Sequence, residues 1–167
     1  MPKGFTLIEI ILVLAIFSVL SLAGIESITQ FQKSALLRGT SDEFAAVLRS
    51  ARTKSMNGEL LEGEKPEDFA SDGLPIYGLK TDSASYTLFR RYILVCNPPN
   101  PCPTVQDSDL ENYLLSTQLS FSGNGQIIFQ RITGSPVSGS NLQFTLVREN
   151  STDKSIIDIT SVGVVKE

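Results

Sequence analysis

The chain has 167 residues, of which 41% are hydrophobic and 19% are charged. This length suits one domain with an appendage, and the composition is too apolar for a disordered chain. The formal net charge of −4 argues against an electrostatic grip on nucleic acid, which needs clustered Lys and Arg, but it leaves room for a local basic patch. The chain contains no His, so it lacks the usual residue of triad hydrolases and of most zinc sites.

The segment from Phe5 to Ile25 is predominantly apolar, and its only charged residue is Glu9. As a helix it would span about 30 Å, the thickness of a bilayer core. We therefore expect residues 5–25 to form a transmembrane helix. A secretory signal peptide or a simple signal anchor is the alternative. Against it, the basic region before the apolar run is only Met1–Gly4, and Ser21-Leu22-Ala23 is a poor cleavage site.

Glu9 is the chemically unusual residue of this segment. An ionised carboxylate inside a membrane costs about 2.5–3.5 kcal/mol on insertion scales, so such a residue is a functional candidate. The alternative is that Glu9 lies near the interface and extends its carboxylate to water. In a water-free assembly of helices, the carboxylate would need a cationic partner.

The sequence Lys3-Gly4-Phe5-Thr6-Leu7-Ile8-Glu9 resembles the prepilin (class III) signal of type IV pilins and of type II secretion pseudopilins. The resemblance implies that a membrane-embedded aspartyl peptidase cuts between Gly4 and Phe5 and then methylates the new amino terminus of Phe5. Residues 1–4 would be a leader peptide, and Glu9 would be the fifth residue of the mature chain. In a filament, the amino group of Phe5 from the same or a neighbouring subunit is the natural partner of Glu9.

The helical pattern continues beyond the apolar segment. From Glu26 to Met56 there is no Pro and the only Gly is Gly39, while Asn57-Gly58 is a good helix stop. We expect one helix from Phe5 to about Asn57, roughly 80 Å long, whose second half is amphipathic. The alternative is two helices broken at Gly39. The apolar stripe of the second half consists of Leu37, Phe44, Val47, Leu48 and Ala51.

The rest of the chain predicts an acid-rich loop over Glu59–Gly73 and then short strands. Ser122-Gly123-Asn124-Gly125 predicts a hairpin turn between two of the strands, and Asn150–Asp153 predicts another turn. The expected fold is therefore α+β, a long helix packed on an antiparallel β-sheet in a pilin-like roll. The expected strands are Leu74–Leu79, Tyr86–Val95, Gln118–Phe121, Gln126–Ile132, Leu142–Arg148, Ser155–Ile159 and a short Val162–Val165.

The downstream half resembles FimT-like minor pilins and H-type pseudopilins. The resemblance rests on Phe44–Arg52, on the Ser120–Gly125 turn and on the Ile157–Gly163 ending. Many major pilins carry a Pro within the N-terminal helix, whereas this chain has none between Pro2 and Pro66. The expected organisation is a leader at 1–4, a transmembrane and filament-core helix at 5–25, and an extracytoplasmic globular domain at 26–167.

Cys96 and Cys102 are the only cysteines, and the segment between them contains three prolines. Outside the cytoplasm we expect a disulfide that pins an irregular loop, with two free thiols as the alternative. The spacing is too long for a CxxC redox or zinc pair. The loop could also be a knob that binds a partner.

Asp107, Asp109 and Glu111 could suggest a calcium site, but they lack the Gly turn and full ligand set of an EF-hand loop. We expect instead the N-terminus of a helix leading into Leu110–Leu115. DNA binding would need basic residues, and the chain has two basic clusters: Arg90-Arg91, and a helical group of Arg49, Arg52 and Lys54. Some FimT-like minor pilins bind DNA for uptake, but the helical group is more simply the polar face of the helix.

The resemblance implies a structural minor pilin or pseudopilin of a type IV pilus or type II secretion pseudopilus, with no enzymatic activity, cofactor or metal. It would be a single-pass protein of the cytoplasmic membrane with its C-terminal domain outside, later extracted into a filament. Its partners would be other subunits, the prepilin peptidase, the inner-membrane assembly platform and membrane lipid. The alternatives are a signal-anchored envelope binding protein without a filament role, or a minor pilin for DNA uptake.

Overall fold

A computed structural model describes residues 5–69, 73–93, 105–140, 142–149, 151–163 and 165–166. The chain forms two compact units, Met1–Leu36 and Leu37–Glu167. We call them the N-terminal unit and the C-terminal unit.

One continuous α-helix, α1, runs from Leu7 to Asn57. Gly39 does not break it, so the prediction of a single helix is confirmed and the two-helix alternative is wrong. The helix begins after Thr6, whose carbonyl accepts hydrogen bonds from the backbone amides of Glu9 and Ile10. It ends at Gly58, which adopts a φ of 59°, a left-handed conformation that glycine tolerates without strain.

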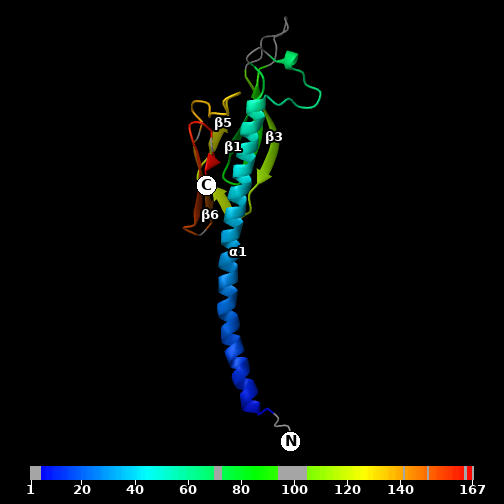
Figure 1. The fold of residues 1–167 in the computed structure, drawn as a ribbon. Helices are drawn as coiled ribbons and strands as arrows, with labels where there is room; N and C mark the ends of the chain where they lie inside the picture. Colours follow the sequence, from blue (N-terminus) through cyan, green and yellow to red (C-terminus); the bar gives the residue numbers. More distant parts are fainter. Residues whose placement is uncertain are drawn as a thin grey trace. The chain divides into compact units, whose positions relative to one another are not determined.

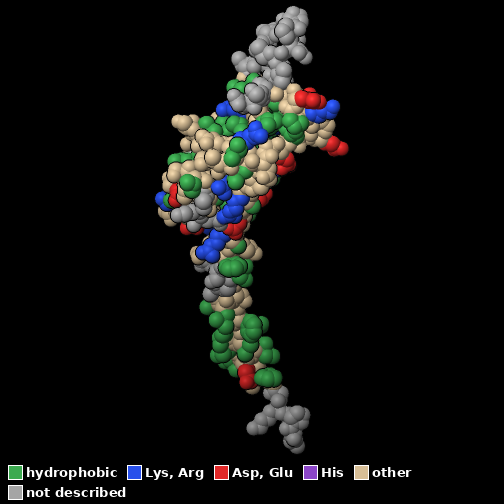
Figure 2. All heavy atoms as spheres, turned by 45° about the horizontal axis from the view of Figure 1, so that its top comes forward, with side chains coloured by type: hydrophobic (Ala, Val, Ile, Leu, Met, Phe, Trp, Pro, Cys, Tyr) green, Lys and Arg blue, Asp and Glu red, His purple; other side chains and the backbone are tan. Residues whose placement is uncertain are grey.

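The N-terminal unit contains the first part of α1, and its large apolar side chains from Phe5 to Leu20 are exposed in the isolated chain. Figure 2 shows hydrophobic side chains along the visible face of this part of the helix. Within the described residues, no helix is both long enough and apolar enough to cross a membrane. The transmembrane role of residues 5–25 therefore stays a prediction.

In the described residues of the C-terminal unit, the end of α1 is joined to two antiparallel sheets of four strands each, and Figure 1 shows the strands beside the helix. This arrangement confirms the α+β fold, although the strands form two sheets rather than one. A short 3-10 helix, η1 (Pro66–Asp68), lies in the acid-rich loop after α1. The first sheet has the order β3-β2-β1-β5, with β1 at Ile76–Thr81, β2 at Ser85–Tyr92, β3 at Gln106–Leu114 and β5 at Gly125–Ile128. The second has the order β4-β6-β7-β8, with β4 at Leu119–Phe121, β6 at Gln143–Arg148, β7 at Lys154–Ile159 and β8 at Val165–Lys166.

The segment Ser122–Gly125 does not close a hairpin, so that prediction is wrong. The strand before it, β4, pairs with β6, whereas the strand after it, β5, pairs with β1 in the other sheet. The Thr81 hydroxyl accepts a hydrogen bond of 2.9 Å from the Gly125 amide, which fixes the start of β5 against β1. The segment is therefore a crossing between the two sheets. The predicted turn before Asp153 does connect two paired strands, β6 and β7, although Asn150 lies outside the described residues.

The predicted helix at Leu110–Leu115 is also wrong, because Gln106–Leu114 forms strand β3 at the edge of the first sheet. β3 pairs with β2, and the register shifts between Leu88 and Phe89. Phe89 is opposite Asp109 and Leu88 is opposite Glu111, so Leu110 is an extra, bulged residue. Pairing with β2 has overridden the weak local preference of this polar segment.

Phe44 of α1 is the centre of the core of the C-terminal unit. Its ring is fully buried, and its centroid lies 5.0 Å from that of Tyr86 in the first sheet. The rings of Phe121 and Phe144 in the second sheet are 5.1 and 5.3 Å away. The predicted amphipathic stripe thus packs against both sheets, with Leu37, Phe44, Leu48 and Ala51 all buried.

Arg52 joins α1 to two loops that are distant in sequence. Its Nε atom donates to the Gly134 carbonyl oxygen at 3.2 Å, and a terminal nitrogen donates to the Val162 carbonyl oxygen at 3.3 Å. A Cβ at Gly163 would lie 1.9 Å from the Gly134 carbonyl oxygen, so the two loops touch where only glycine fits. Arg52 therefore holds loops together and is more than a member of the polar helix face.

Candidate assembly site

The first turns of α1 present apolar side chains on every side. Phe5 is 80% exposed, Phe17 is 66% exposed, and the aliphatic residues between them are also exposed. A helix that is apolar all round cannot be stable in water by its own burial, since it has no polar face to solvate. This surface requires either a lipid or a protein environment.

Glu9 is the acidic residue in the first turn of α1, where the helix dipole favours a negative charge. Its backbone amide points toward the Thr6 hydroxyl at 3.4 Å, which is a weak cap. Together with Phe5, Glu9 lines a shallow groove of about 250 Å³ along the helix. The other residues of the groove are Ile10, Val13 and Leu14. The carboxylate therefore lies beside an apolar surface that a neighbouring helix could fill.

Two hydroxyls farther along this helix are satisfied by the helix itself. Ser18 donates to the Leu14 carbonyl oxygen and Ser21 donates to the Phe17 carbonyl oxygen, both at 2.8 Å. Such bonds to the preceding turn let serine enter an apolar environment without an unpaired polar group. Among residues 7–21, Glu9 is thus the polar side chain that has no side-chain partner within the described part of the chain.

Some of the predicted site residues lie within the described part of the chain, and others lie outside it. Phe5 and Glu9 are described, and they are one helical turn apart in sequence. Gly4, the other half of the predicted cleavage site, lies outside the described residues, as do Cys96 and Cys102. Cleavage, methylation and the disulfide stay predictions.

The Arg90-Arg91 cluster does not form a free basic patch. Arg90 is buried and pairs with Glu64 at 2.7 Å, while its guanidinium lies 4.7 Å from the centre of the Tyr92 ring. Burial alone would raise the pKa of Glu64, but the hydrogen bonds from Arg90 and from the Leu61 amide outweigh it and lower that pKa. This pair fastens the loop after α1 to β2.

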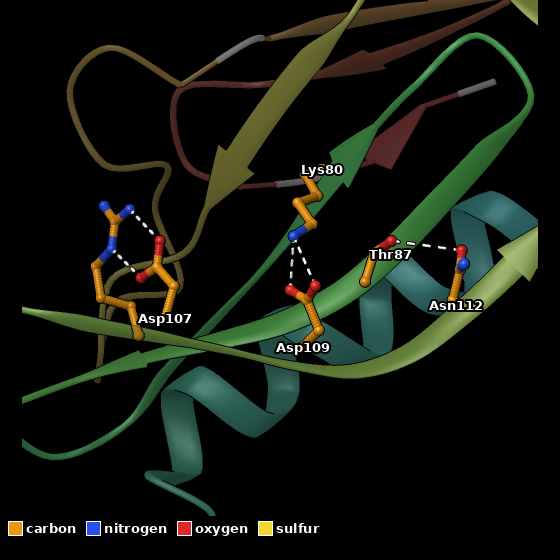
Figure 3. Close-up of polar contacts among 6 residues, drawn as sticks. Lys80, Thr87, Asp107, Asp109 and Asn112 are labelled. Carbon is orange, nitrogen blue, oxygen red and sulfur yellow. Dashed lines mark hydrogen bonds and ion pairs between the residues drawn. The ribbon is translucent and has the colours of Figure 1, made fainter.

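Asp107 and Asp109 of β3 pair with basic residues of β2 and β1 (Figure 3). Asp107 accepts two hydrogen bonds from Arg91, at 2.7 and 2.8 Å, and Asp109 pairs with Lys80 at 2.7 Å. The hydrogen bond from Arg91 is the main cause that lowers the pKa of Asp107. Within the described residues, no group of three or more acidic, His or Cys side chains could hold a metal ion. The acids of β3 that suggested calcium thus serve mainly as ion-pair partners.

Sequence reasoning missed one polar cluster of the C-terminal unit. Tyr86 of β2 and Tyr113 of β3 stack with their centroids 4.8 Å apart, and the Tyr113 hydroxyl donates to Glu111. Burial is the main cause that raises the pKa of Tyr86, and the hydrogen bond with Glu111 is the main cause that raises the pKa of Tyr113; the nearby Glu43 carboxylate of α1 raises both further. These four residues come from three elements, and nothing in their local sequence indicates that they meet.

Residues 2–25 match the family model described as the prokaryotic N-terminal methylation motif. The match supports a type IV pilin-like or pseudopilin-type protein that is processed as a prepilin. It covers the predicted leader and apolar segment but does not reach the C-terminal unit, so the FimT-like or H-type resemblance stays a prediction. No curated protein and no solved structure matches the chain.

Proposed function

We propose that this chain is a structural, non-enzymatic subunit, a minor pilin or pseudopilin of a type IV pilus or type II secretion pseudopilus. The prepilin peptidase cuts it between Gly4 and Phe5 and methylates Phe5. Residues 5–25 hold the mature chain in the cytoplasmic membrane, with the C-terminal domain outside. The inner-membrane assembly platform then transfers it into a filament with other subunits.

The observation that carries this proposal is the match at residues 2–25, together with a single acidic side chain on an otherwise apolar helix surface. Lipid anchoring alone does not call for a carboxylate at Glu9. When helices pack together without water, the Glu9 carboxylate can form an ion pair, because the amino group of Phe5 on a neighbouring subunit can neutralise it. An ion pair of this kind favours one axial register over others.

Mass spectrometry of the mature amino terminus tests the processing step. We expect the chain to start at a methylated Phe5. An uncut Met1, or a cut near Ala23, would defeat the pilin interpretation in favour of a signal-anchored or secreted envelope protein.

Substitutions at Glu9 test the assembly step. Glu9→Gln should remain in the membrane fraction and be cut normally, but its amount in sheared filaments should fall about tenfold or more, since a buried amine loses its counter-charge. Glu9→Asp is the matched control, because it keeps the charge and should retain part of the incorporation. Normal incorporation of Glu9→Gln would contradict the proposed role of the carboxylate.

A further inference from the structure

Met56 lies where α1 meets the turn at residues 130–135, which we call the 130–135 turn. A Cβ atom at Gly134 would be 2.7 Å from the Met56 Sδ atom and 2.8 Å from the Arg52 Nε atom. The thioether and the guanidinium therefore lie side by side against the same α-carbon. The Arg52 Nε atom also donates to the Gly134 carbonyl oxygen at 3.2 Å. Met56 and Arg52 together hold the 130–135 turn against the end of the helix.

The 130–135 turn has a strained backbone at Ile132. The Thr133 amide donates to the Arg131 carbonyl oxygen at 2.8 Å, and Ile132 between them has a φ of 71°. A γ-turn with positive φ is rare, and a β-branched side chain makes it less favourable still. The Ile132 side chain is 74% exposed, so its own packing does not hold this conformation. Such strain persists only where the surrounding contacts fix the backbone, and the junction with α1 is one of these contacts.

The Met56 thioether is open to a small oxidant. The Met56 side chain is 38% exposed, and the only other methionine of the chain is Met1 in the proposed leader. Hydrogen peroxide converts a thioether into a sulfoxide. The sulfur attacks one peroxide oxygen, and an S–O bond forms as the O–O bond breaks. The proton of the transferred oxygen passes to the departing hydroxide, which leaves as water, so the sulfur is oxidised and the peroxide is reduced.

A sulfoxide oxygen at Met56 disturbs the junction with the 130–135 turn. It is a hydrogen-bond acceptor, whereas the thioether sulfur is only a weak one. The Arg52 Nε–H group lies beside the sulfur, but it is a single donor that the Gly134 carbonyl already uses. The new oxygen must therefore take this donor, or turn toward water and carry the side chain away from Gly134. Either outcome removes a contact that holds the turn, and the strain at Ile132 favours its release.

We propose that Met56 is a site of reversible oxidation by peroxide, and that the sulfoxide releases the 130–135 turn from α1. This inference goes beyond the proposed filament function and does not depend on it, because all the contacts involved lie within the C-terminal unit.

Peroxide treatment of the purified full-length protein tests both parts of this proposal. Mass spectrometry should find one added oxygen on the peptide that contains Met56. Hydrogen exchange should then become about tenfold faster at the Gly134 amide, which donates to the Gln130 carbonyl oxygen at 3.0 Å in the closed turn. Reduction by methionine sulfoxide reductases should restore slow exchange. The proposal would be overturned if Met56 stayed unoxidised while free methionine in the same solution was consumed, or if full oxidation left the exchange rate unchanged.

Three variants separate the Met56 sulfoxide from other effects of peroxide. Met56→Leu is the matched control, because it keeps an apolar side chain of similar volume and cannot take up oxygen. Its Gly134 amide should exchange slowly with and without peroxide, which excludes oxidation of Cys96 or Cys102 as the cause. Met56→Gln places a polar group at the junction and should show fast exchange without peroxide. Ile132→Gly removes the backbone strain, so oxidation should change its exchange less. An equal response to peroxide in Met56→Leu would refute the assignment to Met56.

Discussion

The N-terminal and C-terminal units bury their apolar residues in different ways. The C-terminal unit buries Phe44 completely among rings from two sheets, whereas the N-terminal unit leaves Phe17 66% exposed. The C-terminal unit therefore carries its stability within the chain, and the N-terminal unit depends on what surrounds it. Substitutions in the C-terminal unit should act on unfolding, while those in the N-terminal unit should act on assembly.

The largest expected effect comes from Phe44→Ala. Loss of the ring that joins both sheets should lower the free energy of unfolding by about 3–5 kcal/mol. Phe17→Ala is the matched control and should change it by about 0.5 kcal/mol or less, because the side chain is exposed in the isolated chain. Thermal unfolding of the purified full chain, followed by calorimetry, measures both. Equal losses of unfolding free energy in the two variants would contradict the proposed difference between the two units.

Arg52→Ala should have the next largest effect. The Gly134 and Val162 carbonyls lose charged donors, which costs about 1–3 kcal/mol. Arg52→Lys should recover only part of this, since one ammonium cannot reproduce the forked guanidinium. Chemical denaturation measures the loss. If Arg52→Ala were as stable as the unchanged protein, the two loops would be held by their own backbone contacts.

A smaller, pH-dependent loss of stability should follow from Glu64→Gln, which removes the Glu64–Arg90 ion pair. The folded-state pKa of Glu64 is lowered, so its contribution to stability is present above the unfolded pKa near 4.5 and is lost as the pH falls through the folded pKa. The difference in melting temperature between the unchanged protein and Glu64→Gln should therefore shrink on acidification from neutral pH. Glu62→Gln, an exposed neighbour, serves as the control. A difference that stays constant down to low pH would contradict a charged role.

The smallest effect should come from Asp109→Asn. The Lys80 and Asp109 side chains are 44% and 57% exposed, so the pair should be worth about 0–1 kcal/mol and should weaken with added salt. Denaturation at low and high ionic strength measures it. A loss well above this range would mean that Asp109 has a further role in holding β3 at the sheet edge.

The sequence predicted α1 well because its signals are local. Apolar residues at helical spacing and the Asn57-Gly58 stop indicated its extent within two residues at each end. The strands with β-branched and aromatic residues were also found, with shifts of a few residues at their ends. For example, Leu142–Arg148 was predicted and β6 spans Gln143–Arg148.

What the sequence could not predict depends on contacts between distant residues. β3 is polar and its residues favour a helix start, and its strand form depends on backbone pairing with β2, which lies distant in sequence. The crossing at Ser122–Gly125 has a good hairpin sequence, but β5 is paired with β1 instead of β4. The cluster of Glu43, Tyr86, Glu111 and Tyr113 likewise unites residues far apart in sequence, so no short motif indicates it.

The stacked rings of Tyr86 and Tyr113 have a consequence for optical spectroscopy. The chain has four tyrosines and no tryptophan, and all four tyrosines lie in β1, β2 or β3. The tyrosine bands of near-ultraviolet circular dichroism and the tyrosine fluorescence of this protein therefore report on one sheet, without labels. A change in the tyrosine signal on oligomerisation would come from this sheet, because the long apolar helix contains no tyrosine.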